Sequence, residues 1–187
     1  MTDHHLRITG GCLKGRKLAL QKDDRARYTS SKVRKAIFDI VGEIEDFEVL
    51  DLFSGSGSFS VEALSRGVRA ATCVEKDREM ARLLRSNLSS LALDKRCLVL
   101  HMDVIYAVRR LAREKRRYDL VFLDPPYEGD FVKETIGALS EHRVCREEGL
   151  IVVEHSKREP IRMIPDEWCL EKQRFYGDTV ISLIRCQ

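Results

Sequence analysis

The chain has 187 residues, of which 43% are hydrophobic and 34% are charged, and its formal net charge is +3. This length favours a single domain with one sizeable core. No apolar run approaches the roughly eighteen residues of a transmembrane helix, and the N-terminus lacks the apolar segment of a secretory signal, so the sequence excludes a membrane protein and predicts a cytoplasmic one.

The basic excess is an N-terminal feature. Residues 1–35 contain ten Lys or Arg against three Asp, a local charge of +7, so the remainder carries −4. The segment from Leu6 to Leu20 predicts a β-hairpin with Gly10-Gly11 near its bend. A basic hairpin suits the phosphates of a nucleic acid, although a solvated strand pair is the alternative. The side chains predicted to contact RNA are Arg7, Lys14, Arg16 and Lys17.

We expect residues 1–28 to form this arm and residues 29–187 to form the main domain, in which helix and strand patterns alternate. Such alternation predicts parallel strands joined by crossover helices. The predicted helices are Ser31–Val41, Ser58–Arg66, Arg78–Leu91, Val104–Lys115 and Phe131–Ser140. The predicted strands are Phe47–Leu50, Ala70–Val74, Arg96–Met102, Tyr118–Leu123, Leu150–Glu154, Cys169–Phe175 and Thr179–Arg185, the last two flanking a hairpin signal at Tyr176-Gly177-Asp178.

A glycine-rich turn, Asp51-Leu52-Phe53-Ser54-Gly55-Ser56-Gly57, joins a predicted strand to a predicted helix. Glycines allow positive φ and close approach to a ligand, which predicts a small-molecule site; a plain tight turn is the alternative. The spacing, with Ser60 in the third glycine position, is a poor dinucleotide fingerprint. Asp51 would repel a pyrophosphate by roughly 1–4 kcal/mol, so the cationic S-adenosylmethionine fits better than NAD.

Acidic residues also end the predicted strands that follow. Glu75 comes 24 positions after Asp51, where a carboxylate suits the hydroxyls of a ribose. Asp103 is placed to accept a hydrogen bond from an adenine amino group. Because the carboxyl ends of parallel strands lie at one edge of an α/β sheet, we expect Asp51, Glu75, Asp103 and Asp124 to share one rim.

The fourth of these strands ends in Asp124-Pro125-Pro126-Tyr127. A conjugated exocyclic amine is a poor nucleophile, so an enzyme that methylates it gains by accepting its N–H hydrogen bonds and orienting the nitrogen lone pair. Asp124 and the Pro125 carbonyl would accept these bonds, while Tyr127 stacks on the base. A simple strand-ending turn is the alternative, because proline favours extended neighbours.

Taken together, these residues resemble the class I S-adenosylmethionine-dependent methyltransferases, and more closely the RsmD-like guanine-N2 methyltransferases of small-subunit (16S) ribosomal RNA. The likeness runs nearly the whole chain. The sequence departs from the family at Tyr28, where a proline is expected, and at Ser60, where relatives often carry glycine. The other segments that carry the likeness are Arg7-Ile8-Thr9-Gly10-Gly11, Lys14-Gly15-Arg16-Lys17-Leu18, Thr29, Val33-Arg34-Lys35-Ala36-Ile37-Phe38 and Glu62-Ala63-Leu64-Ser65-Arg66-Gly67.

The resemblance implies an α/β, Rossmann-like fold with a mostly parallel seven-stranded sheet, an antiparallel C-terminal hairpin and the short N-terminal β-hairpin arm. It also implies methyl transfer from S-adenosylmethionine to the N2 amine of a guanine in 16S rRNA, within a small ribosomal subunit or assembly intermediate, by a monomer. Asp124, Pro125 and Tyr127 would then be catalytic. The residues assigned to the cofactor are Thr29, Asp51, Phe53, Gly55, Gly57, Glu75, Lys76, Asp103 and Val104.

Two other functions stay open. A DNA adenine-N6 methyltransferase would use the same Asp-Pro-Pro-Tyr chemistry, although only the short arm is left over to read a DNA sequence. A catalytically silent RNA-binding module would not need S-adenosylmethionine, so equilibrium binding of that compound discriminates the two classes. The six cysteines are scattered, without Cys-x-x-Cys or histidine partners at metal spacing, and the sequence therefore predicts neither a disulfide nor a metal site.

Overall fold

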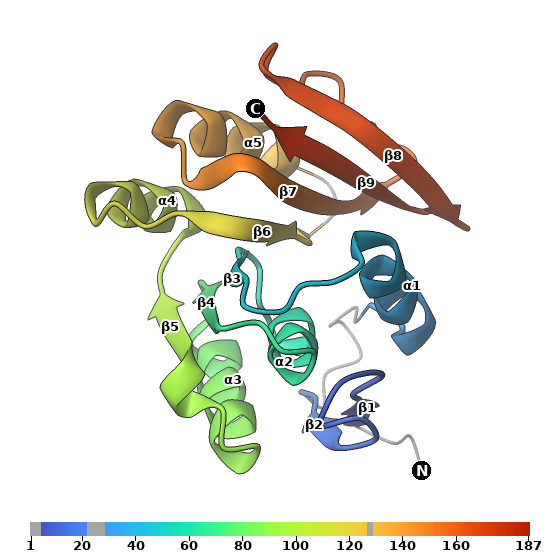
Figure 1. Ribbon diagram of the computed structural model, residues 1–187, viewed down its shortest axis with the longest axis vertical. Helices are drawn as coiled ribbons and strands as arrows, with labels where there is room; N and C mark the ends of the chain where they lie inside the picture. Colours follow the sequence, from blue (N-terminus) through green and yellow to red (C-terminus); the bar gives the residue numbers. More distant parts are fainter. Residues whose placement is uncertain (1–4, 22–28, 127–128) are drawn as a thin grey trace.

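The computed structural model describes residues 5–21, 29–126 and 129–187, and its centre is a seven-stranded sheet in the order β5-β4-β3-β6-β7-β9-β8 (Figure 1). Strands β5, β4, β3, β6 and β7 pair in parallel, whereas β9 is antiparallel to both β7 and β8. The predicted α/β sheet and its antiparallel C-terminal hairpin are confirmed. Within the described ranges, no helix is long and apolar enough to cross a bilayer.

The helices and strands lie close to their predicted positions. The helices are α1 (Ser31–Val41), α2 (Ser58–Ser65), α3 (Arg78–Ser90), α4 (Val104–Arg113) and α5 (Phe131–His142), with a 3-10 turn, η1, at Asp94–Arg96. The strands of the sheet are β3 (Glu48–Asp51), β4 (Ala70–Glu75), β5 (Cys97–His101), β6 (Tyr118–Leu123), β7 (Cys145–Ser156), β8 (Trp168–Tyr176) and β9 (Thr179–Cys186). Two bounds differ enough to matter: β3 includes Asp51, and β7 begins five residues before the predicted Leu150.

Strand β7 is longer than predicted because its first half does not look like a strand in sequence. Arg146, Glu147 and Glu148 are exposed and polar, so they break the apolar run on which the prediction rested. Cys145 nevertheless pairs with Tyr118 of β6, and the register shifts before the regular pairing resumes at Leu150.

The sheet separates two hydrophobic layers, as expected when both faces are covered by helices. Alternate strand residues such as Val49 and Phe122 pack with helices α1, α2 and α3, whereas Leu50 and Leu123 pack with α4 and α5. The side chain at the end of each strand therefore points into the layer that its place in the alternation dictates.

The N-terminal segment forms the predicted hairpin from β1 (His5–Arg7) and β2 (Lys17–Ala19), paired antiparallel. Ile8 and Leu18 are buried in the hydrophobic layer of α1, α2 and α3, so the hairpin packs against the helices that cover this face of the main sheet. Asn87 of α3 accepts a hydrogen bond from the Ala19 N–H (3.1 Å) and donates to the Ser56 carbonyl (2.9 Å), which connects the hairpin to the glycine-rich turn. The basic side chains Arg7, Lys14, Arg16 and Lys17 are exposed.

A buried ion pair holds the hairpin, α1 and α2 together. The Arg34 and Glu62 side chains are 2% and 1% exposed, and Arg34 Nε lies 3.3 Å from Glu62 Oε2. Arg34 also donates to the Arg7 carbonyl (2.7 Å), while Glu62 accepts from the Thr9 N–H (2.8 Å) and hydroxyl (2.7 Å) and from Arg66 Nε (3.0 Å). Burial lowers the pKa of Arg34 from its ordinary value, against the opposing effect of the Glu62 charge.

Candidate active site

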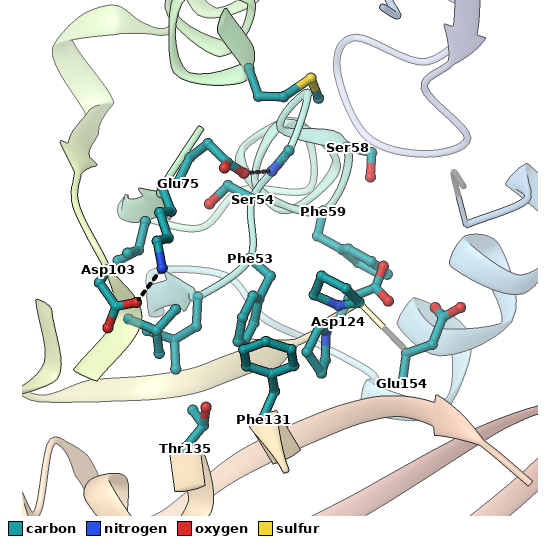
Figure 2. Close-up of a pocket in the computed structure, with 18 of the residues that line it drawn as sticks. Phe53, Ser54, Ser58, Phe59, Glu75, Asp103, Asp124, Phe131, Thr135 and Glu154 are labelled. Carbon is teal, nitrogen blue, oxygen red and sulfur yellow. Dashed lines mark hydrogen bonds and ion pairs between the residues drawn. The ribbon is translucent and has the colours of Figure 1, made fainter. Parts of the chain in front are cut away.

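A cavity of about 600 Å³ opens at the carboxyl ends of the parallel strands (Figure 2). This volume suits a ligand of cofactor size. Nine of the twelve residues predicted to be catalytic or to bind the cofactor line it: Thr29, Phe53, Gly55, Glu75, Lys76, Asp103, Val104, Asp124 and Pro125. Tyr127 lies outside the described residues. The remaining two, Asp51 and Gly57, lie behind the wall.

The glycine-rich turn places its two glycines differently. Both have positive φ, 51° at Gly55 and 88° at Gly57. A Cβ at Gly55 would meet only the end of Met80 at 3.7 Å, whereas a Cβ at Gly57 would lie 2.4 Å from Leu84 Cδ1. Gly55 therefore faces the cavity, and Gly57 is required for packing against α3 and for the left-handed start of α2.

Glu75 and Asp103 form the wall at the β4 and β5 side. Glu75 Oε2 accepts a hydrogen bond from the Gly55 N–H (2.8 Å), and its Oε1 accepts from the Asp77 N–H (2.7 Å). Asp103 caps α4 by accepting from the Ile105 N–H (3.0 Å), and its other oxygen lies 3.2 Å from Lys76 Nζ (Figure 2). The Glu75 carboxylate thus links the turn after β3 to the end of β4, and backbone N–H groups hold the Glu75 and Asp103 carboxylates in place.

Asp51 is buried rather than placed on the rim, with 1% exposure. It shares the strand face of Val49 and so points beneath α2, where Ser60 Oγ donates to its Oδ2 at 2.7 Å. Ser60, the position where relatives often carry glycine, also contacts Cys73 Sγ at 2.9 Å. Burial raises the pKa of Asp51 to about 6, although the hydrogen bonds from Ser60 favour its charged form.

This environment predicts a pH-dependent stability. Asp51 keeps its proton up to about pH 6 in the folded chain but releases it near its ordinary pKa of 3.8 in the unfolded chain, so its contribution to stability is fully present below pH 3.8 and is lost as the pH rises to 6. The loss amounts to about 3 kcal/mol. Asp51→Asn removes the titration but keeps an acceptor for Ser60. Urea unfolding from pH 4 to 7.5 should show the wild type losing stability relative to this variant; parallel curves would contradict the assignment.

The Asp124 corner lies at the β6 and β7 side. Asp124 Oδ2 accepts a hydrogen bond from the Thr29 hydroxyl at 2.9 Å, and the same hydroxyl lies 2.9 Å from Glu154 Oε2. Thr29 is 7% exposed and directly precedes the capping residue of α1. In Figure 2 the Asp124 and Glu154 carboxylates occupy one corner of the cavity, apart from Glu75 and Asp103.

Several lining residues escaped the sequence analysis. One of them is Phe131, which meets the predicted Phe53 edge to face, with ring centroids 6.4 Å apart, so that the two rings form an aromatic part of the wall. Glu154 was detectable, because it ends a predicted strand as the four chosen carboxylates do. The other lining residues that were missed are Leu52, Ser54, Ser56, Ser58, Phe59, Val74, Met80, Ile105, Pro126, Glu134 and Thr135.

This strand order, with the antiparallel strand β9 inserted next to β8 and the cavity at the parallel strand ends, is the class I methyltransferase fold. The model of one family, described as Conserved hypothetical protein 95, matches residues 6–185, and the chain belongs to this family. The RsmD-like resemblance is confirmed by a relative, Ribosomal RNA small subunit methyltransferase D of Escherichia coli (strain K12), which is 32% identical over 95% of this chain and 88% of its own.

Solved structures agree with the fold. The Escherichia coli protein yhhF superimposes with a TM-score of 0.85 at 28% identity, covering 98% of both chains. SMU.776, whose crystal structure contains SAH, superimposes with a TM-score of 0.67 at 20% identity, covering 82% of this chain and 48% of that one. The second likeness concerns the fold alone.

Proposed function

We propose that the chain transfers a methyl group from S-adenosylmethionine to the N2 amine of a guanine in small-subunit (16S) rRNA. One observation supports this most directly: Asp124 and Pro125 line the same cavity as Gly55, Glu75 and Asp103. A donor held by the second set would therefore lie within reach of a base held by the first. The name of the Escherichia coli relative supports the rRNA substrate.

The donor-binding half of the cavity fits S-adenosylmethionine chemically. This compound supplies an electrophilic methyl group on a cationic sulfur. Glu75 would accept from the ribose hydroxyls, Asp103 from the adenine amine, and the Gly55 backbone would line the amino-acid part. Phe53 and Val104 add apolar wall, and Thr29 and Lys76 also line the cavity. Asp51 and Gly57 lie behind the wall and would act on the donor by supporting the glycine-rich turn.

The acceptor half would orient the amine. Asp124 and the Pro125 carbonyl would accept its N–H bonds, leaving the nitrogen lone pair directed at the methyl group. The nitrogen forms a bond to the methyl carbon as the carbon–sulfur bond breaks, and the amine then loses a proton. The guanine must leave its stack to enter, at a cost of a few kcal/mol, part of which stacking on Tyr127 would offset.

The substrate would be a ribonucleoprotein, either a small ribosomal subunit or an assembly intermediate, and the protein would act as a cytoplasmic monomer. The exposed basic side chains of the hairpin would contact RNA phosphates: Arg7, Lys14, Arg16 and Lys17.

The test is methyl transfer from tritiated S-adenosylmethionine to purified 16S rRNA, small subunits, assembly intermediates and DNA in parallel, followed by nucleoside analysis. We expect N2-methylguanosine in rRNA or a ribosomal particle. N6-methyladenine in DNA would establish the alternative methyltransferase, and no binding of S-adenosylmethionine would establish the silent RNA-binding module.

The Glu75 carboxylate provides a separate test of donor binding. Glu75→Ala should weaken S-adenosylmethionine binding roughly 10- to 150-fold, the range for hydrogen bonds to a charged group. Isothermal titration calorimetry measures this directly. Glu75→Gln keeps an acceptor for the Gly55 N–H and separates loop support from ligand contact. Exposed Glu79 on α3 is the control, since Glu79→Ala should leave affinity unchanged. An unchanged affinity in folded Glu75→Ala would refute the role.

A further inference from the structure

The strand register brings Glu154 next to Asp124. Leu123 of β6 pairs with Val153 of β7 in parallel, so the next residue on each strand lies beside the other. Phe122 and Val152 belong to the hydrophobic layer of α1, α2 and α3, and two residues further each side chain returns to that face. The two carboxyl groups therefore meet beneath the start of α1.

Burial and hydrogen bonds hold the two carboxyl groups in this position. Glu154 is 5% exposed and lines the cavity, and Thr29 Oγ1 lies 2.9 Å from one oxygen of each carboxyl group. Thr29 is itself held, because Arg34 Nη1 donates to its carbonyl at 3.4 Å and Arg34 is paired with Glu62. Thr29, itself held by Arg34, consequently keeps the Asp124 and Glu154 carboxyl groups side by side at one end of the cavity.

A pair of adjacent acceptors matches one nucleobase edge. Guanine presents two neighbouring donors, N1–H and the N2 amine, on the edge that a flipped base offers to a protein. Adenine and 2-aminopurine carry a lone pair at N1, which would face a carboxylate oxygen without a hydrogen between them. A buried polar group left without its partner discriminates strongly against such analogues.

We propose that Glu154 is the residue that selects guanine, by accepting a hydrogen bond from N1–H while Asp124 accepts from the N2 amine. This inference rests on the proposed function and extends it from the reacting amine to the neighbouring ring position. Glu154 contacts the base in this role, and Thr29 acts as a positioning residue that keeps both carboxyl groups in register.

The test compares two RNA substrates that share the reactive N2 amine. Once the methylated nucleotide is mapped, RNA is ligated with either guanine or 2-aminopurine at that position. The wild type should prefer guanine by at least a hundredfold in kcat/KM. In Glu154→Gln the amide donates to N1 of 2-aminopurine, so the preference should fall at least tenfold. Glu134→Gln, which changes a lining carboxylate on α5, should keep the wild-type preference.

A binding measurement on the wild type alone covers the case in which Glu154→Gln does not fold. RNA with inosine at the target position retains N1–H but lacks the amine, and it should inhibit methyl transfer at least tenfold better than RNA with purine. Equal inhibition, or an unchanged preference in folded Glu154→Gln, would overturn the inference while leaving guanine methylation intact. Absence of guanine methylation by the wild type would overturn the proposed function as well.

Discussion

Replacing Asp124 with alanine should lower methyl transfer to rRNA at least about a hundredfold, the typical effect of removing one preorganised hydrogen-bonding group from an active site. The variant loses the carboxylate that would accept from the amine. Donor affinity should stay within a few fold, because Glu75 and Asp103, the carboxylates proposed to bind the donor, lie at other strand ends. The measurements are initial rates with tritiated donor and calorimetry with S-adenosylmethionine.

A conservative variant sharpens this result. Asp124→Asn keeps one acceptor oxygen, both for the amine and for the Thr29 hydroxyl, so it should retain more activity than the alanine variant. Thermal unfolding of both variants checks that the fold is intact. Full activity of Asp124→Ala would discard the assignment of this carboxylate to the reaction.

The second large effect concerns stability. Glu62→Ala should lower the free energy of unfolding by about 3–5 kcal/mol, because it leaves the Arg34 guanidinium buried without its counter-charge. The midpoint of thermal unfolding should fall by roughly 6–20 °C for a chain of this size. The hairpin should also detach, because Thr9 loses both hydrogen bonds to Glu62.

Exposed Glu79 is the matched control. It pairs with Arg82 at 2.7 Å, but the two side chains are 64% and 56% exposed, so Glu79→Ala should cost less than about 1 kcal/mol. Hydrogen exchange of the Ile8 and Cys12 amides reports on the hairpin separately from the core. Equal stability of the two variants would show that the buried pair is not what secures the hairpin.

Local patterns predicted the elements of this fold because each pattern spans only a few residues. Alternating helix and strand signals placed the five helices found among the described residues, and Tyr176-Gly177-Asp178 marked the turn between β8 and β9. The prediction of strand bounds failed for an equally local reason. The polar residues Arg146, Glu147 and Glu148 hid the first half of β7 from the prediction, because they lie at a register shift between the pairing of Cys145 with Tyr118 and the regular pairing from Leu150 onward.

The candidate site was predictable to the extent that it follows strand ends. Glu75, Asp103 and Asp124 lie on the cavity wall as expected, since parallel strands finish at one edge. Asp51 also ends a parallel strand and was expected at the same edge, yet the structure buries it under α2 beside Ser60. Strand alternation puts Asp51 on the face of Val49, but the sequence position alone does not specify that α2 covers that face at the end of β3.

The amino-acid sequence by itself determined the class of fold, the glycine-rich turn and the carboxylates available for binding, because these depend on residues that are neighbours along the chain. Only the tertiary structure decided that Asp124 and Glu154 share Thr29, and that Arg34 and Glu62 join the hairpin to two helices. Those contacts depend on strand register and helix packing between residues 28 to 125 positions apart, which no local pattern encodes.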